Sequence, residues 1–369
     1  MATMSFRLEP VSFDDLPGWR DDDPTKVIEA MRRCRKHVSN KPYRTGSMGI
    51  SVDDLMPAFS ASSADVDTAD GARAFFEKHF APFRIKPEAG SGFVTAFYEP
   101  EIEVRAEADE TYRYPLYRRP ADLVDIDDTN RPDGMDPYFA FGLSEDGRIS
   151  EYPDRRAIEQ GYLAGRGLEI AYAKSKVEVF FVHVQGAARL LFPNGSRRRV
   201  TYAAKTGHYF SAVGKLLIER GKIDAATVSM MSIRDWLEAH PDDVDEVLWH
   251  NRSFIFFREA AVEDEHLGPI AAAKVSLEPG RSLAVDRLIH TFGVPFYIAS
   301  ESLTRLDDGK PFQRLMLALD TGSAIVGPAR GDIFTGSGFE AGERAGAVRN
   351  PADFYVFVPK AAAARYGHA

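Results

Sequence analysis

The fold can be inferred from Arg314-Leu315-Met316-Leu317-Ala318-Leu319-Asp320-Thr321-Gly322, an apolar run that ends at a turn. Apolar runs of this length, bounded by turn residues, are typical of buried strands. Comparable short segments lie at residues 253–257, 282–285, 294–298 and 354–358. Glycine and proline separate these segments, and no long helical pattern lies between them. The sequence therefore predicts a mainly β fold, and a closed barrel fits it better than a doubly wound parallel sheet.

The rest of the chain mixes helical and strand patterns. Asp23 and Pro24 are typical of a helix start, Asp70 is expected to cap a second helix, and three more helices are expected between residues 210 and 249. Further strands are predicted at residues 93–98 and 177–184, the second of them before a turn at residues 193–195. Because no linker divides the chain, an inserted domain is as plausible as two domains in tandem.

The composition is that of a globular protein with a negative net charge. Of the 369 residues, 44% are hydrophobic and 27% are charged, and 46 Lys and Arg against 55 Asp and Glu give a net charge of −9. Nucleic acid is not an expected partner, because phosphate affinity comes mostly from cationic side chains. No apolar stretch approaches the ~20 residues of a membrane span. The first twenty residues contain no signal-peptide core, and Cys34 follows Met31-Arg32-Arg33, which is not a lipoprotein cleavage site.

Two aspartates in the C-terminal third are candidates for catalysis. Asp320 follows the apolar run, and Asp332 lies in Arg330-Gly331-Asp332-Ile333-Phe334. Carboxyl groups at strand ends can face a cleft, where apolar walls raise their pKa toward the range that a general acid needs. The alternative is that both aspartates only form turns and caps. The glycines at 336, 338 and 342 do not have the spacing of a dinucleotide-binding loop.

Other catalytic classes fit the sequence less well. The turn Asp320-Thr321-Gly322-Ser323 is similar to the active-site turn of aspartic proteases, but a single copy would need a homodimer to supply the second carboxylate. The histidines at 183, 208, 240, 250 and 290 are scattered rather than spaced as metal ligands, and Cys34 is the single cysteine. No metal site is therefore expected. The chain also lacks a Gly-x-Ser-x-Gly nucleophile elbow.

A series of motifs in a fixed order is more specific than any one of them. The motifs are Gly92-Phe93-Val94-Thr95-Ala96-Phe97-Tyr98-Glu99-Pro100, Tyr114-Pro115-Leu116-Tyr117-Arg118-Arg119-Pro120, Phe180-Phe181-Val182-His183-Val184-Gln185-Gly186, Ala204-Lys205-Thr206-Gly207-His208, Asn251-Arg252-Ser253-Phe254-Ile255-Phe256-Phe257 and Pro279-Gly280-Arg281-Ser282-Leu283-Ala284-Val285-Asp286. Together with the stretch from Asp320 to Gly346, this series resembles the membrane-bound lytic murein transglycosylase A (MltA) family. The resemblance includes the C-terminal 3D region, named for three aspartates, which match Asp286, Asp320 and Asp332.

The resemblance implies a mainly β protein with flanking helices, in which a double-psi β-barrel domain carries an inserted smaller β-barrel domain. The double-psi domain would comprise residues 1–103 and 251–369, and the insert residues 104–250. The family cleaves the β-1,4 bond between N-acetylmuramic acid and N-acetylglucosamine in peptidoglycan, without water or a cofactor, and leaves a 1,6-anhydromuramoyl end. The expected partner is the glycan strand, bound in a groove between the domains. The expected location is the periplasm or outer membrane, although membrane association would need a signal that this sequence does not show.

The resemblance also implies roles for single residues. Asp332 matches the catalytic acid, which would protonate the glycosidic oxygen and then take the proton of the muramic C6 hydroxyl as that oxygen attacks C1. Asp320 would support Asp332 or the sugar, and Asp286 would be structural. The expected substrate-binding residues are Thr95, Tyr98, Glu99, Gln185 and Lys205.

The sequence departs from the family pattern at positions expected to contact the sugar. The usual Gln-Gly-Ser-Gly is Gln185-Gly186-Ala187-Ala188 here, and the common Thr-Gly-Tyr-Tyr is Thr95-Ala96-Phe97-Tyr98. A frequent tryptophan corresponds to Tyr172. These departures leave a second function open, that of a peptidoglycan-binding protein without catalysis.

Overall fold

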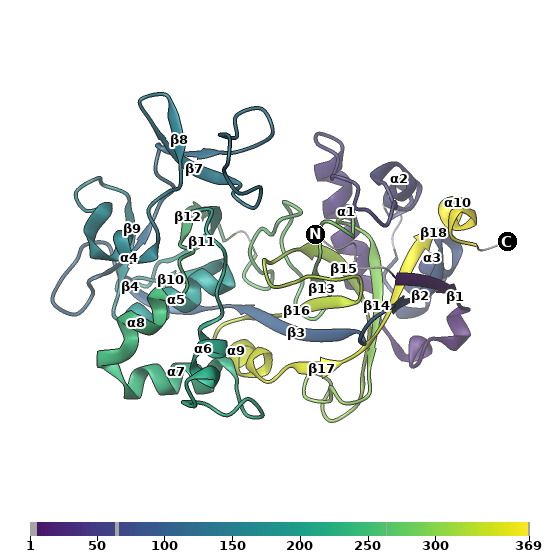
Figure 1. The fold of residues 1–369 in the computed structure, drawn as a ribbon. Helices are drawn as coiled ribbons and strands as arrows, with labels where there is room; N and C mark the ends of the chain where they lie inside the picture. The colour runs from purple at the N-terminus through teal and green to yellow at the C-terminus, as the bar shows by residue number, and fades with distance from the viewer. Residues whose placement is uncertain (1–5, 63–65, 263, 368–369) are drawn as a thin grey trace. The chain divides into compact units, whose positions relative to one another are not determined.

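The computed structural model describes residues 6–62, 66–262 and 264–367, and the chain divides into two compact units (Figure 1). The first unit comprises Met1–Tyr98 and Asp264–Ala369, and the second is the insert Glu99–Glu263. The expected boundaries, 103/104 and 250/251, fall inside this insert. Strand β4 (Glu101–Arg105) spans the first of them and β12 (Ile255–Ala260) lies beyond the second, yet both strands pair within the insert's own sheet.

The first unit is built on a nine-stranded sheet. Its strands, in spatial order, are β1 (Phe6–Pro10), β2 (Phe80–Pro87), β18 (Asp353–Pro359), β14 (Pro295–Ser300), β15 (Phe312–Asp320), β13 (Ser282–Val285), β16 (Arg330–Ser337), β3 (Phe93–Glu99) and β17 (Arg349–Pro351). The strand β13 runs parallel to β15 and antiparallel to β16. Among the described residues, β1 and β17 are the two ends of this order, so the hydrogen-bonded ladder is not closed into a complete barrel.

Most of the strands expected from the sequence are confirmed. The segments expected at 93–98, 282–285, 294–298, 314–319 and 354–358 correspond to β3, β13, β14, β15 and β18, with ends that move by at most two residues. The segment at 253–257 begins two residues later, as β12. Short apolar runs between glycine and proline therefore locate the strands of this fold well.

The helices α1 (Thr25–Val38) and α3 (Ala69–His79) lie close to where they are expected. Asp23 accepts a hydrogen bond from the backbone N–H of Thr25 at 3.1 Å, so α1 begins one residue later than the sequence suggests. Thr68, rather than Asp70, caps α3 with its side-chain oxygen. Asp70 instead lies in the first turn of α3, where its negative charge interacts favourably with the helix dipole and stabilises the helix.

The sequence does not predict α2 (Val52–Ala61). Ser51 and Asp54 form a capping box at its start. Pro57 lies inside the helix, where a proline is unfavourable. The C-terminal region adds α9 (Phe339–Gly346) and α10 (Lys360–Ala363). Single-turn segments lie at Phe13–Asp15, Trp19–Asp21, Ile158–Tyr162, Pro241–Asp243 and Ala364–Tyr366.

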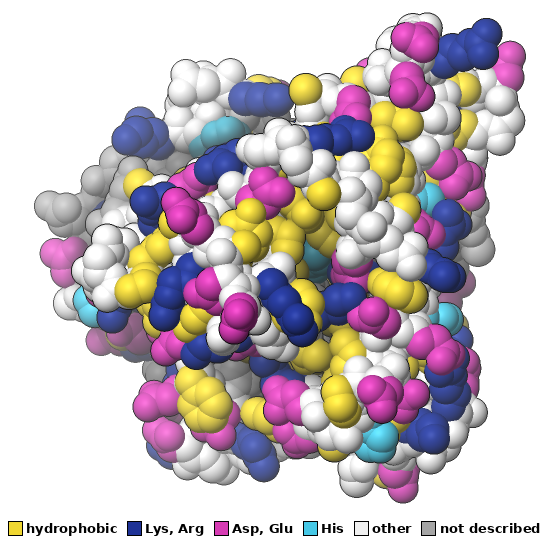
Figure 2. Space-filling model, turned by 90° about the vertical axis from the view of Figure 1, so that its left-hand side faces the viewer, with side chains coloured by type: hydrophobic (Ala, Val, Ile, Leu, Met, Phe, Trp, Pro, Cys, Tyr) yellow, Lys and Arg dark blue, Asp and Glu magenta, His cyan; other side chains and the backbone are white. Residues whose placement is uncertain are grey.

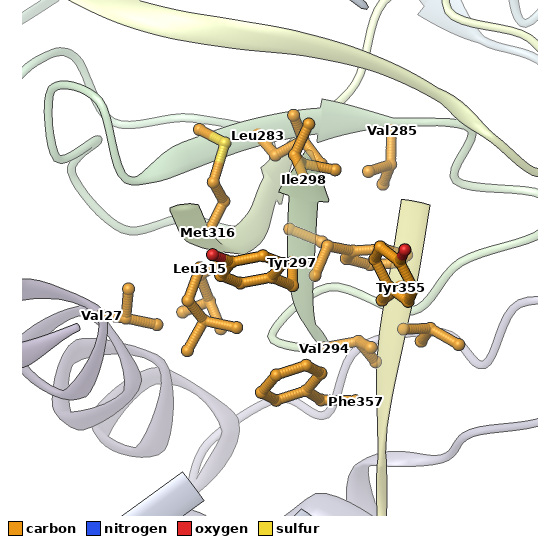
Figure 3. Packing of buried hydrophobic residues seen from close by; sticks show 14 of the residues in the cluster. Val27, Leu283, Val285, Val294, Tyr297, Ile298, Leu315, Met316, Tyr355 and Phe357 are labelled. Carbon is orange, nitrogen blue, oxygen red and sulfur yellow. The ribbon is translucent and has the colours of Figure 1, made fainter. Parts of the chain in front are cut away.

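The core of the first unit lies between this sheet and the N-terminal helices. Figure 3 shows Tyr297 of β14 and Leu315 of β15 near Phe357 of β18, with Val27 of α1 beside them. All four side chains are buried. Burial of apolar surface contributes roughly 25 cal/mol per Å². This packing makes the sheet a rigid support for side chains on its exposed face.

The insert has two sheets of its own. The larger follows the order β12, β11 (Arg197–Lys205), β10 (Ala187–Leu191), β4, β9 (Glu169–Ala173) and β5 (Tyr114–Tyr117), and the smaller the order β6 (Leu123–Asp125), β7 (Phe141–Glu145) and β8 (Arg148–Ser150). Its helices are α4 (Arg155–Ala157), α5 (Lys176–Gln185), α6 (Val213–Glu219), α7 (Met230–Ala239) and α8 (Val244–Trp249). The last three confirm the helices expected between residues 210 and 249.

The strand predicted at residues 177–184 is wrong, because this segment is the helix α5. Ser175 caps its start by accepting the N–H groups of Val177 and Glu178, and Gly186 ends it in the left-handed conformation with φ 75°. Two different hydrophobic clusters bury opposite sides of α5. A helix that is apolar all round shows no polar face, so its period is hidden in the sequence. The predicted turn at 193–195 joins β10 to β11 instead.

The described surface of the chain is charged and mixed. Figure 2 shows acidic and basic side chains interspersed over one face, with hydrophobic side chains between them. Within the described ranges, no helix combines the length and the apolar character needed to cross a membrane.

Candidate active site

The strands β15 and β16 place Asp320 and Asp332 on either side of β13. Ala284 of β13 pairs with Asp320 of β15 on one side and with Asp332 of β16 on the other, and the β13–β15 ladder shifts register between Leu283 and Ala284. The two aspartates are therefore two strand spacings apart, roughly 10 Å between their backbones. The negative charge of Asp332 contributes to the raised pKa of Asp320, so the two carboxyl groups lie within electrostatic reach of each other.

Asp332 is held by a chain of hydrogen bonds that runs through Thr95 to Arg330. The Thr95 hydroxyl donates to Oδ1 of Asp332 in a short contact. The same hydroxyl accepts a hydrogen bond from Nη2 of Arg330 at 2.7 Å. Because the guanidinium can only donate, the hydroxyl proton of Thr95 is directed at Asp332. The sequence analysis expects Thr95 at the site but does not identify Arg330 or Ala284.

Aromatic contacts fix the same region. The guanidinium carbon of Arg330 lies 5.6 Å from the ring centroid of Phe93, and the rings of Phe97 and Phe334 are 5.3 Å apart. Phe93, Thr95 and Phe97 alternate along β3, so all three project from one side of the strand. Arg330 and Phe334 lie two residues before and after Asp332 on β16, and they share its face for the same reason.

Burial raises the pKa of both aspartates. For Asp332, loss of solvent raises the pKa of the carboxyl above its ordinary value, and the hydrogen bond from Thr95 and the charge of Arg330 oppose this rise. For Asp320, burial raises the pKa to about 6, against backbone N–H bonds from Thr321 and Ala272 that lower it. A carboxyl with a raised pKa keeps its proton closer to neutral pH, as a general acid requires.

Asp286 stabilises the turn that follows β13. Its carboxylate accepts the backbone N–H of Leu288 at 3.0 Å and that of Gly327 at 2.9 Å. The side chain is 7% exposed. A carboxylate that accepts two backbone N–H groups joins the two loops that carry them, and these contacts favour a structural role for Asp286.

Glu99 and Tyr98, which are also expected to bind substrate, contact residues other than the two aspartates. The carboxylate of Glu99 is fully buried and accepts hydrogen bonds from Arg189 at 3.0 Å and Arg199 at 2.9 Å. This placement gives Glu99 a structural position in the insert rather than an accessible carboxylate. The ring of Tyr98 packs on Gly342 of α9, where an added Cβ would come within 2.7 Å of the ring.

Gln185 and Lys205 belong to the insert. Gln185 Nε2 lies 3.4 Å from the sulfur of Met230. Lys205 donates to the hydroxyl of Tyr138 at 3.1 Å, and Tyr138 stacks on Tyr209 with ring centroids 3.8 Å apart. Tyr209 is 52% exposed. This pair of stacked rings beside a lysine presents an aromatic surface of the kind on which sugar rings stack.

The substitutions Ala187 and Ala188 lie in β10. Both side chains are buried, and they pair with Thr201 and Val200 of β11. The serine of the family pattern corresponds to Ala187, opposite Thr201, whose buried hydroxyl has no hydrogen-bond partner among the described residues. The family glycine corresponds to Ala188, which packs in an apolar cluster. Ala188 therefore suits the interior of the insert.

Two cavities of the first unit lie away from the aspartates. One, of about 410 Å³, is lined by Arg305, Glu340, Glu343 and Arg344. The other, of about 540 Å³, lies at the ends of β2, β14 and β18. Neither is lined by Asp320 or Asp332.

Comparison with known proteins identifies the family. Residues 93–258 match the MltA specific insert domain, and residues 281–358 match the 3D domain. A crystal structure of a membrane-bound lytic murein transglycosylase from Agrobacterium tumefaciens is 62% identical to this chain, with a TM-score of 0.93 over 98% of this chain and 99% of that one. The chain belongs to the MltA family.

More distant MltA proteins agree with this assignment. The membrane-bound lytic murein transglycosylase A of Vibrio cholerae is 32% identical over 70% of this chain, and the match covers 62% of that relative. A crystal structure of MltA from Escherichia coli with bound chitohexaose is 26% identical, with a TM-score of 0.67 over 97% of this chain and 95% of that one. This chain thus matches less than two thirds of the length of the Vibrio protein.

MltA membership bears on two of the expectations. The predicted mainly β class with flanking helices is confirmed, and the double-psi β-barrel is that of the MltA structures, although the ladder of the first unit stays open between β1 and β17. The turn at Asp320 lies within the 3D match, so the aspartic protease alternative has no support.

Proposed function

We propose that this protein is a peptidoglycan lytic transglycosylase that cleaves the bond between N-acetylmuramic acid and N-acetylglucosamine without water. Membership of the MltA family supports the reaction class. The observation that carries the proposal is Asp332, a half-buried carboxyl with a raised pKa and a hydrogen-bond donor directed at one oxygen. The other oxygen is left for a substrate.

In the proposed reaction Asp332 acts first as an acid and then as a base. Its proton passes to the glycosidic oxygen as the bond to C1 of muramic acid breaks, through a state with oxocarbenium character. The resulting carboxylate takes the proton of the C6 hydroxyl, whose oxygen forms the new bond to C1. The nucleophile is already attached to the ring, so its high effective concentration takes the place of an activated water. Asp332 ends the cycle protonated, and the product is a 1,6-anhydro end.

The hydrogen bond from Thr95 stabilises the stage of this cycle in which Asp332 is a carboxylate. A donor aimed at an oxygen that gains negative charge stabilises the state in which Asp332 has lost its proton. Arg330 strengthens this effect by polarising the Thr95 hydroxyl and by placing a positive charge near the site. Both groups therefore favour proton transfer from Asp332 to the leaving oxygen.

We assign Asp320 a supporting role. Its carboxyl accepts the backbone N–H of Ala272, at 3.1 Å to Oδ1, and that of Thr321. These bonds hold the carboxyl in place, and its remaining acceptor capacity can bind a sugar hydroxyl while its charge can stabilise the developing positive charge of the ring. Of the residues expected to bind substrate, Thr95, Tyr98, Gln185 and Lys205 remain proposed contacts with the glycan, whereas the buried position of Glu99 favours a structural role.

The two carboxyl groups, on the strands either side of β13, favour a second candidate, a hydrolase. Inverting glycosidases place an acid and a base about 6.5–9.5 Å apart with a water between them. Burial raises the pKa of Asp320 to about 6, which suits a general base, whereas the backbone N–H groups of Thr321 and Ala272 lower that pKa and weaken the carboxylate as a base. The two reactions give different ends, anhydro for the transglycosylase and reducing for the hydrolase.

Digestion of purified sacculi, with the products analysed by mass spectrometry, tests the proposal. Anhydromuropeptides from the wild type and none from Asp332→Asn are the expected result. Reducing ends would favour the hydrolase, and glycan that is bound but intact would favour a binding protein without catalysis. An Asp332→Asn variant that digests sacculi at nearly the wild-type rate would contradict the assignment of the acid.

We further propose that the enzyme acts in the periplasm on glycan strands, because that is where this polymer lies. The relatives are named membrane-bound, and the chitohexaose complex of one of them supports a glycan as ligand. Fractionation of cells that produce the full-length protein would test the location, and its recovery with cytoplasmic markers alone would contradict it.

A further inference from the structure

Arg349 lies one strand away from the residue that holds the proposed acid. It begins the edge strand β17, which pairs antiparallel with β3, and it is directly opposite Thr95. Opposite residues of an antiparallel pair have Cβ atoms about 4.5–5.5 Å apart and point to the same face. Arg349 therefore projects from the same face as Thr95, whose hydroxyl contacts Asp332.

The side chain of Arg349 differs from neighbouring arginines in having no partner. It is exposed, and within the described residues no hydrogen bond or ion pair involves its guanidinium. Arg330 donates to Thr95 at 2.7 Å, and Arg344 of α9 donates to the backbone oxygen of Thr335 at 3.4 Å. Because β17 ends the sheet order, no other strand of residues 6–62, 66–262 and 264–367 pairs on the outer side of Arg349. A cation in this position is free to meet an anionic ligand.

The sugar hydroxyls of the glycan are neutral, so their binding does not require a cation. In peptidoglycan the anionic groups are carboxylates on the lactyl arm of the muramic residue, either at the end of the arm or in the peptide attached to it. A guanidinium binds a carboxylate with two parallel hydrogen bonds and tolerates exposure without losing its charge. The muramic residue is also the one whose C1 must lie next to Asp332 in the proposed reaction.

We propose that Arg349 is a specificity-determining residue that binds a carboxylate on the lactyl arm of the muramic residue at the cleavage site. This inference rests on the proposed function, since it assumes a muramic residue above Asp332. It makes the enzyme distinguish muramic acid, which bears the arm, from N-acetylglucosamine, which lacks it. Arg349 is exposed at the edge of the sheet, so an arm that extends toward it can remain in contact with solvent.

The test compares binding of three ligands to Arg349→Gln, in an Asp332→Asn background that prevents turnover. The ligands are glycan strands that carry peptides, strands stripped of peptides so that the arm ends in its own carboxylate, and uncharged chitohexaose. We expect affinity for at least one of the first two ligands to fall about threefold to tenfold, while that for chitohexaose is unchanged. The strand that responds identifies which carboxylate is bound.

Two further variants sharpen the comparison. Arg349→Lys keeps the charge but not the planar fork, so it should recover part of the lost affinity. Arg305→Gln removes an exposed arginine from the loop between β14 and β15 and should change none of the three affinities. The loss in Arg349→Gln should also shrink as salt is raised.

Equal weakening for chitohexaose, or unchanged affinity for all three ligands, would overturn the role of Arg349. Failure of the proposed function has a different signature, because the wild type would then release no anhydro ends from sacculi. The binding measurement does not depend on turnover, so the two failures can be told apart.

Discussion

Thr95 donates its hydroxyl proton to Asp332 while it accepts a hydrogen bond from Arg330 at 2.7 Å. This arrangement opposes the effect of burial on Asp332. Burial raises the pKa of the carboxyl, and the hydrogen bond and the positive charge lower it. Burial thus favours the protonated form of Asp332, and the hydrogen bond and the positive charge favour loss of that proton to the leaving oxygen.

Replacing Thr95 with Val removes the donor and should slow cleavage about tenfold to hundredfold, because a hydrogen bond to a charged group contributes about 1.5–3 kcal/mol. The lost bond lowers the pKa of Asp332 in the wild type, so that pKa should rise. The alkaline limb of the pH–rate profile, where the acid loses its proton, should then move to higher pH. Thr95→Ser retains the hydroxyl and should keep both the rate and the profile. A profile of Thr95→Val that does not move would contradict this role.

Arg330 should act on the rate rather than on substrate binding. Arg330→Gln removes the charge that lowers the pKa of Asp332, so the alkaline limb should again move to higher pH, with kcat reduced about tenfold and KM little changed. Arg330→Lys keeps the charge without the guanidinium fork and should be intermediate. A rise in KM with kcat unchanged would show instead that Arg330 binds the glycan.

The two aspartates should titrate as interacting groups. Burial is the main cause of the raised pKa of Asp320, about 6, and the negative charge of Asp332 adds to it. In Asp332→Asn this repulsion is absent, so the pKa of Asp320 should fall below that value while remaining above the ordinary value for an aspartate. Carbon-13 NMR of labelled aspartates follows this titration directly. An unchanged pKa would mean that the two carboxyl groups do not sense each other.

The sequence predicts the first unit better than the insert, and the reason is periodicity. Strands such as β13 are short apolar runs bounded by turn residues, so their limits can be seen in the sequence. The helix α5 has apolar side chains on opposite sides and β-branched valines that favour a strand, so the same rule fails there. Helix α2 is missed because Pro57 lies in its interior.

In the candidate site, some residues can be found from sequence motifs and others only from the pairing of strands. Asp332 and Thr95 lie in motifs that a single sequence can match, and the structure joins them by a hydrogen bond. The roles of Arg330 and Arg349 depend on which residues pair across β16, β3 and β17, which no local pattern encodes. One signal was available for Arg330: it precedes Asp332 by two residues, so on a strand the two side chains share a face.

Glu99 provides a test of stability rather than catalysis. Its fully buried carboxylate lies between Arg189 and Arg199, whose side chains are 7% and 3% exposed. Glu99→Gln removes a buried negative charge and leaves both guanidinium groups without that carboxylate in the interior of the insert. Breaking a buried pair in this way costs about 3–5 kcal/mol. The free energy of unfolding, from urea denaturation, should fall by about that amount.

Glu101 supplies the matched control for this change. It also contacts Arg189, at 3.4 Å, but its side chain is 29% exposed and water can replace the contact. Glu101→Gln should therefore cost less than about 1 kcal/mol. Arg189 and Arg199 extend from neighbouring strands of the insert's larger sheet, β10 and β11, so their shared carboxylate joins these strands to the end of β3. Equal losses in the two variants would mean that burial does not set the strength of these pairs, and Glu99 would then be free for a role at the glycan.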